Sequence, residues 1–481
     1  MIMCKGNIYK SIGILVICLC YASCKVPVIP QREANMVVPK MYNDSTATDT
    51  TNMTTVQWRK FFTDPNLVSL IDTALKNNQE LLITLQDIEM ARNEIKIKHG
   101  QLVPTVGARV GAGVEKVGRY TSQGAGDATT EIKPGMETPD PLTDYTAALY
   151  ATWEVDVWKK LHNAKKAAVV HYLSTVEGKN FVLTNLIAEV ANSYYELLAL
   201  NSQLAVVRQN IQLQKNALEI VKVQKTAARV NELAVQKFRA EVLKTQSLEF
   251  DIAQDIKETE NRINFLLARY PQPIPLNQAD FLTLPPARVN SGIPSQLMAG
   301  RPDIRQAELE LAAAKLDVKV ARAEFYPSFS ISATLGLQSF KPGYLFTFPA
   351  SILYSLAGEI AGPLINRNAI KAEFRNANAR QLQALYNYEK VILNAYLEVS
   401  NQLSGISNLQ KSYNLKSEQV DALNQSISIS NDLFRSARAD YLEVLMTQRD
   451  ALEAKLELID TKQKQLTATT HVYRDLGGGW Q

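Results

Sequence analysis

Residues 183–221 read LTNLIAEVANSYYELLALNSQLAVVRQNIQLQKNALEIV, and apolar side chains recur at every seventh position of this stretch. The series consists of Leu183, Val190, Leu197, Leu204, Ile211 and Leu218. A companion series that starts at Leu186 is interrupted by the polar residues Ser193 and Gln214. Sustained alternation of three- and four-residue spacings predicts a coiled-coil seam. A helix over residues 160–228 would be roughly 100 Å long, which exceeds the depth of a globular core.

A second segment of the same kind follows later in the chain. Residues 159–270 contain no proline and a single glycine, and residues 364–476 share both properties. Near the C-terminus the seven-residue spacing returns at Leu445, Leu452, Ile459, Leu466 and Tyr473. Because an internal duplication constrains the architecture of a whole chain, we expect both halves to be built on one plan.

The seven-residue pattern of each half breaks once, near its middle. The breaks lie at residues 228–235 and 437–444, where Asn231 and Asp440 hold equivalent positions. Asn and Asp are preferred N-cap residues, because their side-chain oxygens accept hydrogen bonds from the free N–H groups of a starting helix. Each half is therefore predicted to contain two long antiparallel helices joined by a tight turn.

Two short segments of alternating polarity precede each pair of long helices. In residues 105–114, 145–155 and 328–337 every second side chain is apolar, and residues 350–361 show the pattern less regularly. Such alternation predicts strands with one apolar and one polar face. Four strands are too few for a soluble sandwich, so we expect one hairpin in each half. The expected strands are residues 103–118 and 142–156 in the first half, and residues 327–340 and 350–362 in the second.

The N-terminus resembles a bacterial lipoprotein export signal. Lys5 and Lys10 precede a short apolar core at Ile12–Leu19, and small residues then lead to Cys24. The usual Leu three places before the cysteine is Tyr21 in this chain. The other cysteines lie inside the signal, so Cys24 is the only one left for the mature chain, which excludes a disulfide framework. We expect Cys24 to carry lipid, with plain secretory cleavage nearby as the alternative.

The chain is thus expected to contain two repeats behind a tether. A first helix, predicted at about 64–99, opens the first repeat. Seven prolines lie in residues 271–302, where the first repeat gives way to the second. The expected divisions are a signal peptide at 1–23, a lipidated tether at 24–60, a first repeat at 61–270, a proline-rich linker at 271–300, a second repeat at 301–476 and a glycine-rich tail at 477–481.

Composition excludes several classes of protein. Hydrophobic residues make up 46% of the chain, charged residues 21%, and the net charge is +4, so neither a disordered chain nor a nucleic-acid partner is indicated. The histidines do not have the helical spacing of a metal site, and we find no motif of a catalytic or cofactor site. The chain is therefore expected to have no cofactor, no metal and no enzymatic activity.

The strands indicate an assembly of several copies. After the signal no apolar run approaches the length of a membrane-spanning helix, so a crossing of the membrane would require a closed barrel. The smallest membrane barrels have about eight strands, and one chain offers four. Three copies would give twelve strands, together with twelve long helices in a ring. The sequence thus predicts a homotrimeric channel with a membrane barrel and a helical tunnel.

Three motifs have no obvious catalytic function but support a family resemblance. They are RPDIRQAE at residues 301–308, AEFYPS at residues 323–328 and DLGGGW at residues 475–480. With these motifs the chain closely resembles the TolC-like outer-membrane factors, in their NodT-type lipoprotein branch, over essentially its whole length after the signal.

The resemblance implies a mainly α-helical fold with a small transmembrane β part. In such proteins a trimeric 12-stranded β-barrel continues into a long periplasmic α-helical barrel. It also implies a location in the outer membrane, in contact with its lipid, with an extension into the periplasm. The implied function is the passive exit duct of a tripartite, RND-type efflux pump, whose other components are a periplasmic adaptor and an inner-membrane transporter.

Carried over by position, the two helix turns become the periplasmic tips that dock the adaptor, whereas the alternative is that they are simple connectors. The family usually has Gly at the places of Ala228 and Ala437, and often Asp at the place of Ala234. The expected tip residues are Ala228, Arg229, Val230, Asn231, Leu233, Ala437, Arg438, Asp440, Tyr441 and Leu442.

Family members close the tunnel near these tips with rings of charged side chains. Asp432 and Arg435 are the candidates for such a gate, and a solvated helix face is the alternative reading. Two other functions remain open at this stage, namely a periplasmic adaptor-type coiled-coil lipoprotein and an envelope enzyme. The exported substrate is also open, since drugs, bile salts, metals and dyes all fit a passive duct.

Overall fold

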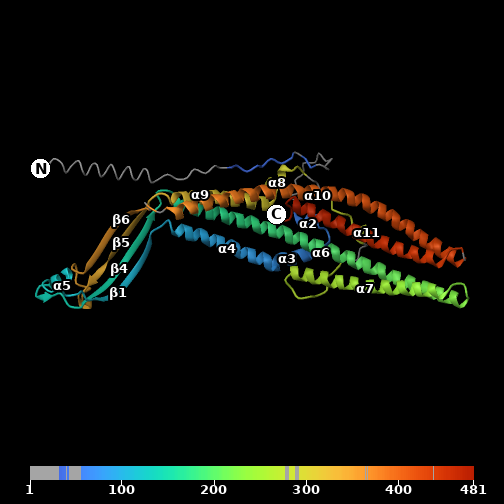
Figure 1. Ribbon diagram of the computed structural model, residues 1–481, viewed down its shortest axis with the longest axis horizontal. Helices are drawn as coiled ribbons and strands as arrows, with labels where there is room; N and C mark the ends of the chain where they lie inside the picture. The colour runs from blue at the N-terminus through green and yellow to red at the C-terminus, as the bar shows by residue number, and fades with distance from the viewer. Residues whose placement is uncertain are drawn as a thin grey trace. The chain divides into compact units, whose positions relative to one another are not determined.

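The computed structural model describes residues 32–39, 41–42, 56–276, 281–287, 292–362, 365, 367–436 and 438–480 (Figure 1). Within these ranges the chain is mainly α-helical and also contains a four-stranded and a two-stranded sheet. The signal peptide, Cys24 and Ala437 lie outside the described residues, as does most of the expected tether.

Two compact units divide the chain, and each takes segments from both halves of the sequence. The units therefore cut across the predicted repeats, because strands and helix ends of both halves pack together. Among the described residues, the strand-bearing unit consists mainly of Glu89–Leu173 and Leu309–Leu385, and the helical unit consists mainly of the described parts of Ala34–Ile88, Ser174–Glu308 and Tyr386–Gln481.

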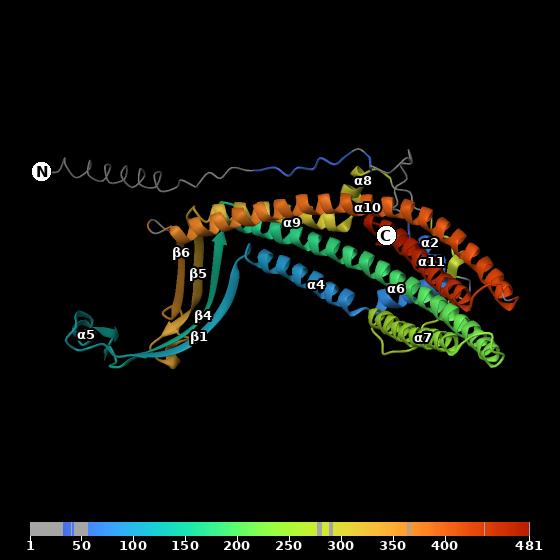
Figure 2. The same ribbon diagram turned by 45° about the vertical axis from the view of Figure 1, so that its right-hand side comes forward.

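Two helices are much longer than the others. Helix α6 has 67 residues and α10 has 68, and each is followed, after a short turn, by a 35-residue helix that runs beside it (Figure 2). The helices are α2 (Trp58–Phe61), α3 (Pro65–Asn77), α4 (Gln79–Gly100), α5 (Ser122–Asp127), α6 (Lys160–Thr226), α7 (Glu232–Leu266), α8 (Ser295–Gly300), α9 (Pro302–Ala323), α10 (Asn368–Arg435) and α11 (Tyr441–Asp475), with short 3-10 turns η2 (Phe281–Thr283) and η3 (Pro342–Tyr344).

The predicted seam of the long helices is buried. Val190 and Leu197 on α6 are almost completely inaccessible, as are Ile459 and Tyr473 on α11. Leu183 and Leu204 are half-buried at the same spacing. The prediction of a coiled-coil seam is thereby confirmed, and most of the stability of such long helices comes from this packing and not from helix propensity.

The first predicted helix is not continuous. The expectation of one helix over 64–99 is wrong at Asn78, which separates α3 from α4. The backbone of Asn78 has φ −56° and ψ 126°, and its Oδ1 accepts a hydrogen bond from the Leu81 N–H at 3.0 Å. Its Nδ2 donates to the Leu266 carbonyl at 2.9 Å. Asn78 thus caps α4 and ties it to the end of α7, a long-range contact that periodicity does not reveal.

The start of α3 follows the predicted capping pattern. Pro65 stands at the first helical position, and Asp64 Oδ1 accepts from the Asn66 N–H at 2.8 Å. Asp64 Oδ2 accepts a second bond, at 2.9 Å, from the hydroxyl of the buried Tyr194. A proline at this position and an aspartate cap are both favourable at a helix N-terminus.

Four antiparallel strands form one sheet, in the order β1-β4-β5-β6. The expected hairpins are β1 with β4 and β5 with β6. The two hairpins are joined by pairing of β4 with β5, which unites the halves of the chain. The strands are β1 (Thr105–Glu115), β4 (Leu142–Val155), β5 (Ser328–Ser339) and β6 (Ile352–Ala361), and a separate ribbon contains β2 (Glu131–Lys133) and β3 (Met136–Glu137).

Candidate functional site

The four-stranded sheet has two chemically different faces. Ala108, Leu149, Leu335 and Tyr354 stand opposite one another across the four strands. The neighbouring row contains Gly107, Tyr150, Thr334 and Ser355. Because successive side chains of a strand point to opposite faces, the first row lies on one face and the second on the other. We call these the apolar face and the polar face.

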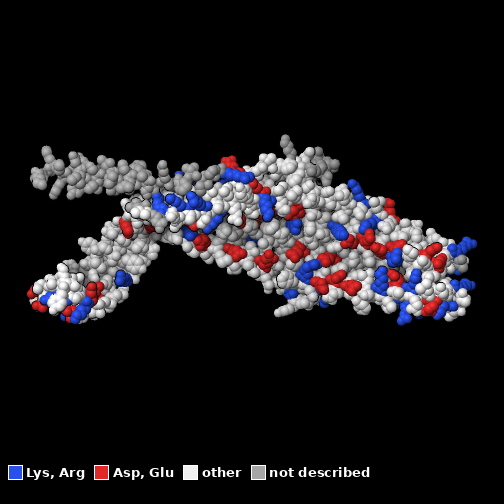
Figure 3. All heavy atoms as spheres, viewed as in Figure 1, with Lys and Arg blue, Asp and Glu red and all other residues white. Residues whose placement is uncertain are grey.

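All charged residues of the four strands lie on the polar face. They are Arg109, Glu115, Asp144, Glu154 and Glu359. The apolar face carries exposed side chains such as Val110, which is 87% accessible, and Leu356, which is 79% accessible. Figure 3 shows few charged side chains over the strands, in contrast to the loop around α5. An exposed, charge-free apolar face of this kind indicates contact with an apolar environment.

The polar face is lined by small residues. Gly107, Gly111, Gly113, Ala148 and Gly336 all belong to it. A Cβ at Gly107 would lie 2.5 Å from the Tyr150 ring, so the tyrosine lies across the glycine. Side chains of this size leave open space in front of the sheet. The polar face therefore suits a water-lined wall better than a packed core.

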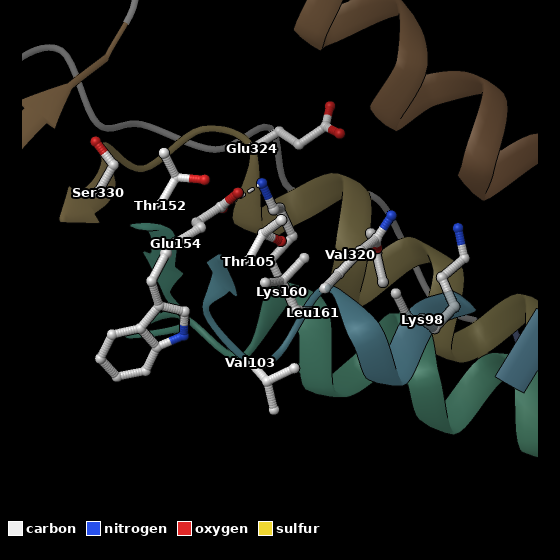
Figure 4. A pocket seen from close by; sticks show the side chains of 13 residues that line it. Lys98, Val103, Thr105, Thr152, Glu154, Lys160, Leu161, Val320, Glu324 and Ser330 are labelled. Atoms are coloured by element: carbon white, nitrogen blue, oxygen red, sulfur yellow. Dashed lines mark ion pairs between the residues drawn. The ribbon is translucent and has the colours of Figure 1, made fainter. Parts of the chain in front are cut away.

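A cavity of about 580 Å³ borders the polar face where the strands meet the helices of the same unit (Figure 4). Thr105, Thr152 and Glu154 line it from the sheet, and Lys160 and Glu324 line it from the adjoining helix ends. Lys160 and Glu154 form an ion pair at 2.6 Å, drawn as a dashed line in Figure 4. The cavity is thus lined by polar and charged side chains of both signs, and it extends the polar face of the sheet toward the helix ends.

At the first tip, α6 ends at Thr226 and α7 begins at Glu232. Asn231 Oδ1 accepts from the Ala234 N–H at 3.2 Å, which confirms the predicted N-cap. Ala228 has a φ of 55°, in the left-handed region that glycine adopts without strain. This conformation explains physically why glycine suits that place in a tight turn.

At the second tip, α10 ends at Arg435 and α11 begins at Tyr441. Asp440 occupies the N-cap position, but its side chain makes no capping hydrogen bond. Its backbone carbonyl instead accepts from the Glu443 N–H at 3.1 Å. The prediction that Asp440 stands at the N-cap of the returning helix is therefore correct, but the predicted side-chain capping bond is absent.

The structure brings the two tips together. Val230 from the first turn and Tyr441 from the second pack against the same apolar cluster, although they lie far apart in the sequence. The polar tip residues Arg229, Asn231 and Arg438 remain exposed. The sequence predicted the turns separately and did not show that they share a core.

The gate candidates Asp432 and Arg435 both lie in the last turn of α10. Both side chains are exposed. The Asp432 carbonyl accepts from the Ser436 N–H at 3.1 Å, which continues the helical geometry into the turn. The two charges therefore stand on the surface directly before the second tip.

Two of the motifs behind the family resemblance meet in space. The buried Arg301 guanidinium makes a two-pronged ion pair with Asp303, contacts Glu398 at 2.8 Å and donates to the Asp475 carbonyl at 3.0 Å. Gly477 has a φ of 88° in the tail that follows. The arginine thus ties the start of α9 to α10 and to the end of α11, where a cation is favourable.

The described part of the chain contains no group of three or more His, Cys, Asp and Glu side chains arranged to hold a metal ion. Nor does any helix in the described ranges have the length and apolar character required to cross a membrane.

Comparison with known proteins identifies the family. Residues 70–269 and 293–478 match the family model for outer membrane efflux proteins. The chain belongs to this family. Membership rests on both halves, and the matched ranges contain all four strands of the main sheet and both pairs of long helices.

Curated relatives match nearly the whole chain. The pyoverdine export outer membrane protein OpmQ of Pseudomonas aeruginosa is 27% identical over 472 residues, which are 98% of this chain and 97% of OpmQ. The probable outer membrane lipoprotein SilC of Salmonella typhimurium is 26% identical over 425 residues, which are 88% of each protein. Among solved structures, the outer-membrane channel OprN has a TM-score of 0.83 at 23% identity, covering 94% of this chain and 99% of OprN.

The family decides between the functions that the sequence left open. This outer-membrane efflux protein is a passive duct located in the outer membrane, with an extension into the periplasm. The resemblance to TolC-like factors and the expected mainly helical fold are confirmed, and the adaptor alternative is not supported. The family consists of transport proteins, which confirms that the chain is not an enzyme.

The two sheet faces predict opposite responses to an added charge. Leu335 lies mid-strand on the apolar face, and Thr334 is its neighbour on the polar face. Leu335→Lys is expected to cost about 2–4 kcal/mol if the site is near the bilayer midplane, so less folded protein should reach the outer membrane. Thr334→Lys should leave the amount of folded protein in the outer membrane close to that of the wild type. Protease-resistant protein in outer-membrane fractions measures both, and equal yields for the two variants would show that the faces are wrongly assigned.

Proposed function

We propose that three copies of the chain form the exit duct of a tripartite efflux pump. The observation that carries this proposal is the open four-stranded sheet with one charge-free face and one polar face. Within the described chain β1 and β6 each pair with a single strand, so both outer edges offer unpaired backbone groups. Such edges are costly in lipid, and pairing β1 of one copy with β6 of the next removes them.

The polar face favours three copies over two. A barrel of about eight strands has an interior that side chains fill, whereas larger barrels leave an aqueous channel. Glycine and alanine recur on the polar face, so its side chains do not fill the space in front of the sheet. Three copies place twelve strands around an open interior, and their long helices form the periplasmic continuation. We further propose that the halves of the chain are two repeats of one wall segment.

Exposed apolar side chains on the long helices support assembly. Within the helical unit, Phe250 on α7 is 73% accessible and Leu415 on α10 is 68% accessible. Others recur on the same helices, namely Leu243 and Phe265 on α7 and Leu393 and Ile429 on α10. Single exposed apolar residues are ordinary, but a stripe of them on each of two long helices is expected to pack against further copies.

The partners follow from the family and from the tips. A periplasmic adaptor and an inner-membrane transporter of the RND type are the proposed partners, with the adaptor bound at the two turns. The exposed Arg229, Asn231 and Leu233 on one turn and Arg438 and Leu442 on the other provide a mixed polar and apolar surface for it. Contact with outer-membrane lipid is proposed for the apolar face of the sheet.

Cys24 is proposed as the lipid attachment site. The cysteine follows a signal-like segment, and it is the only cysteine of the chain after that segment. The name of the relative SilC describes that protein as a probable lipoprotein. Lipid on Cys24 would tie the N-terminus to a membrane, as a second attachment beside the barrel strands.

The proposed docking site predicts a loss of pump assembly after changes at the tips. Asp440→Lys combined with Asn231→Trp reverses a charge on one turn and adds bulk to the other. In-cell cross-linking followed by mass spectrometry should then capture less adaptor while the trimer persists. Asp251→Lys is the matched control, because Asp251 is an exposed acid on α7 well away from the turn. Equal capture from the tip variant and the control would rule out docking at the turns.

The proposed gate predicts a change in ion preference. In a threefold assembly three copies of Asp432 would approach one axis and favour cations. Asp432→Asn should lower the cation-over-anion preference of single channels in planar bilayers, and Arg435→Gln should raise it. Unchanged reversal potentials in both variants would mean that these residues form an ordinary solvated helix face.

A further inference from the structure

A buried polar layer interrupts the apolar packing of α6, α7 and α11. Gln214 on α6 is 1% exposed, Thr245 on α7 is 2% exposed, and Gln448 on α11 is 5% exposed. All three belong to the helical unit. Gln214 is also one of the residues that break the apolar series in the sequence. In the structure, Thr245 and Gln448 are buried polar residues on two other helices.

The layer separates two apolar clusters. The first, which we call the tip cluster, contains Leu218, Val221, Ala234, Val235, Phe238 and Val242, with Phe434, Tyr441 and Leu445 packed against it. The second, the inner cluster, contains Val207, Ile211, Ile252 and Leu452. Gln214 lies between Ile211 and Leu218 along α6, and Gln448 lies between Leu445 and Leu452 along α11. Each helix thus passes from one cluster to the other through a polar residue.

In the described part of the chain, three of the four side-chain amide atoms of Gln214 and Gln448 lack a hydrogen-bond partner. Within the described structure, Oε1 and Nε2 of Gln214 and Oε1 of Gln448 are buried without a partner. Asn210, one turn earlier on α6, has a buried Oδ1 in the same condition. Thr245 differs, since its hydroxyl donates to the Glu241 carbonyl at 3.0 Å.

A buried amide on α11 farther from the tip provides a contrast. Gln465 is 4% exposed, and its Nε2 donates to Gln410 Oε1 at 3.2 Å. The absence of partners is therefore not a general property of buried glutamines in these helices. Burying an unpaired amide costs free energy, whereas water or a new partner restores its hydrogen bonds when helices separate. The layer thus lowers the cost of opening at this level relative to the apolar clusters on either side.

We propose that the Gln214–Gln448 layer is a built-in opening point for the periplasmic tips. The α10–α11 end, with Phe434, Tyr441 and Leu445, separates from the α6–α7 end as a unit, while the inner cluster stays packed. Local opening of this kind occurs where packing is weakest, so the tip can change shape without unfolding the long helices. The inference rests on the proposed function only in assigning the opening to the entrance of the duct.

Hydrogen exchange of the full-length protein in detergent tests the layer. In the wild type, backbone amides of residues 218–224 and 441–448 should exchange faster than those of residues 197–211. Gln214→Met combined with Gln448→Met keeps the unbranched shape and removes the unpaired amides. This double variant should slow exchange at both tip segments by about tenfold or more. In the wild type, opening gives the unpaired amides hydrogen bonds to water, and the methionine variant has no such gain.

Gln465→Met is the matched control, because it makes the same change on α11 at an amide that has a partner. This variant should leave exchange at the tips unchanged and should not increase protection elsewhere. Gln448→Met alone should give part of the effect, which keeps the test decisive if the double variant folds poorly. If tip exchange stays at the wild-type rate in the double variant and in Gln448→Met, the proposal is overturned.

Single-channel recording separates this proposal from the duct itself. If the wild type conducts and the Met variants leave tip exchange unchanged, the opening point is wrong and the duct stands. If the wild type does not conduct, the duct fails, and the exchange result still decides whether the layer weakens the tips. With both correct, the double variant should conduct with fewer transitions to the open state.

Discussion

Every backbone N–H and C=O group of a strand in lipid requires a hydrogen-bonding partner, and a four-stranded sheet leaves two edges unsatisfied. The edges of this sheet are β1 and β6. The remaining features of the strand-bearing unit are consistent with a closure between copies, since all strand charges lie on one face and the other is apolar. Lipid outside and water inside require this division.

The long helices depend on a different interaction, the apolar seam. It is continuous enough to hold helices of 67 and 68 residues in place. Under the proposal made above, the helices of this unit separate first at the polar interruptions of the seam. A duct benefits from both properties, because a wall has to persist while its entrance changes shape. Arg301 adds a fixed point at the far end of α11, where it joins three helices.

Periodicity predicted the strands and the long helices well, because both patterns arise from local alternation along one element. Contacts between distant residues were not predictable in this way. The break at Asn78 depends on a bond to Leu266. The shared core of the tips and the meeting of Arg301 with the end of α11 also depend on the tertiary fold. At Asp440 a residue type favourable for capping was present, but the turn left its side chain without the capping bond.

Cysteine cross-linking between the sheet edges tests the central claim most directly. One cysteine replaces Val110 on β1, and a second is scanned over residues 354–358 of β6. These strands lie at opposite edges of the sheet, so the disulfide has to join different copies. The account predicts that oxidation yields a covalent trimer on denaturing gels for at least one pair. Folded, membrane-inserted protein that stays monomeric for every pair would contradict closure of the barrel between copies.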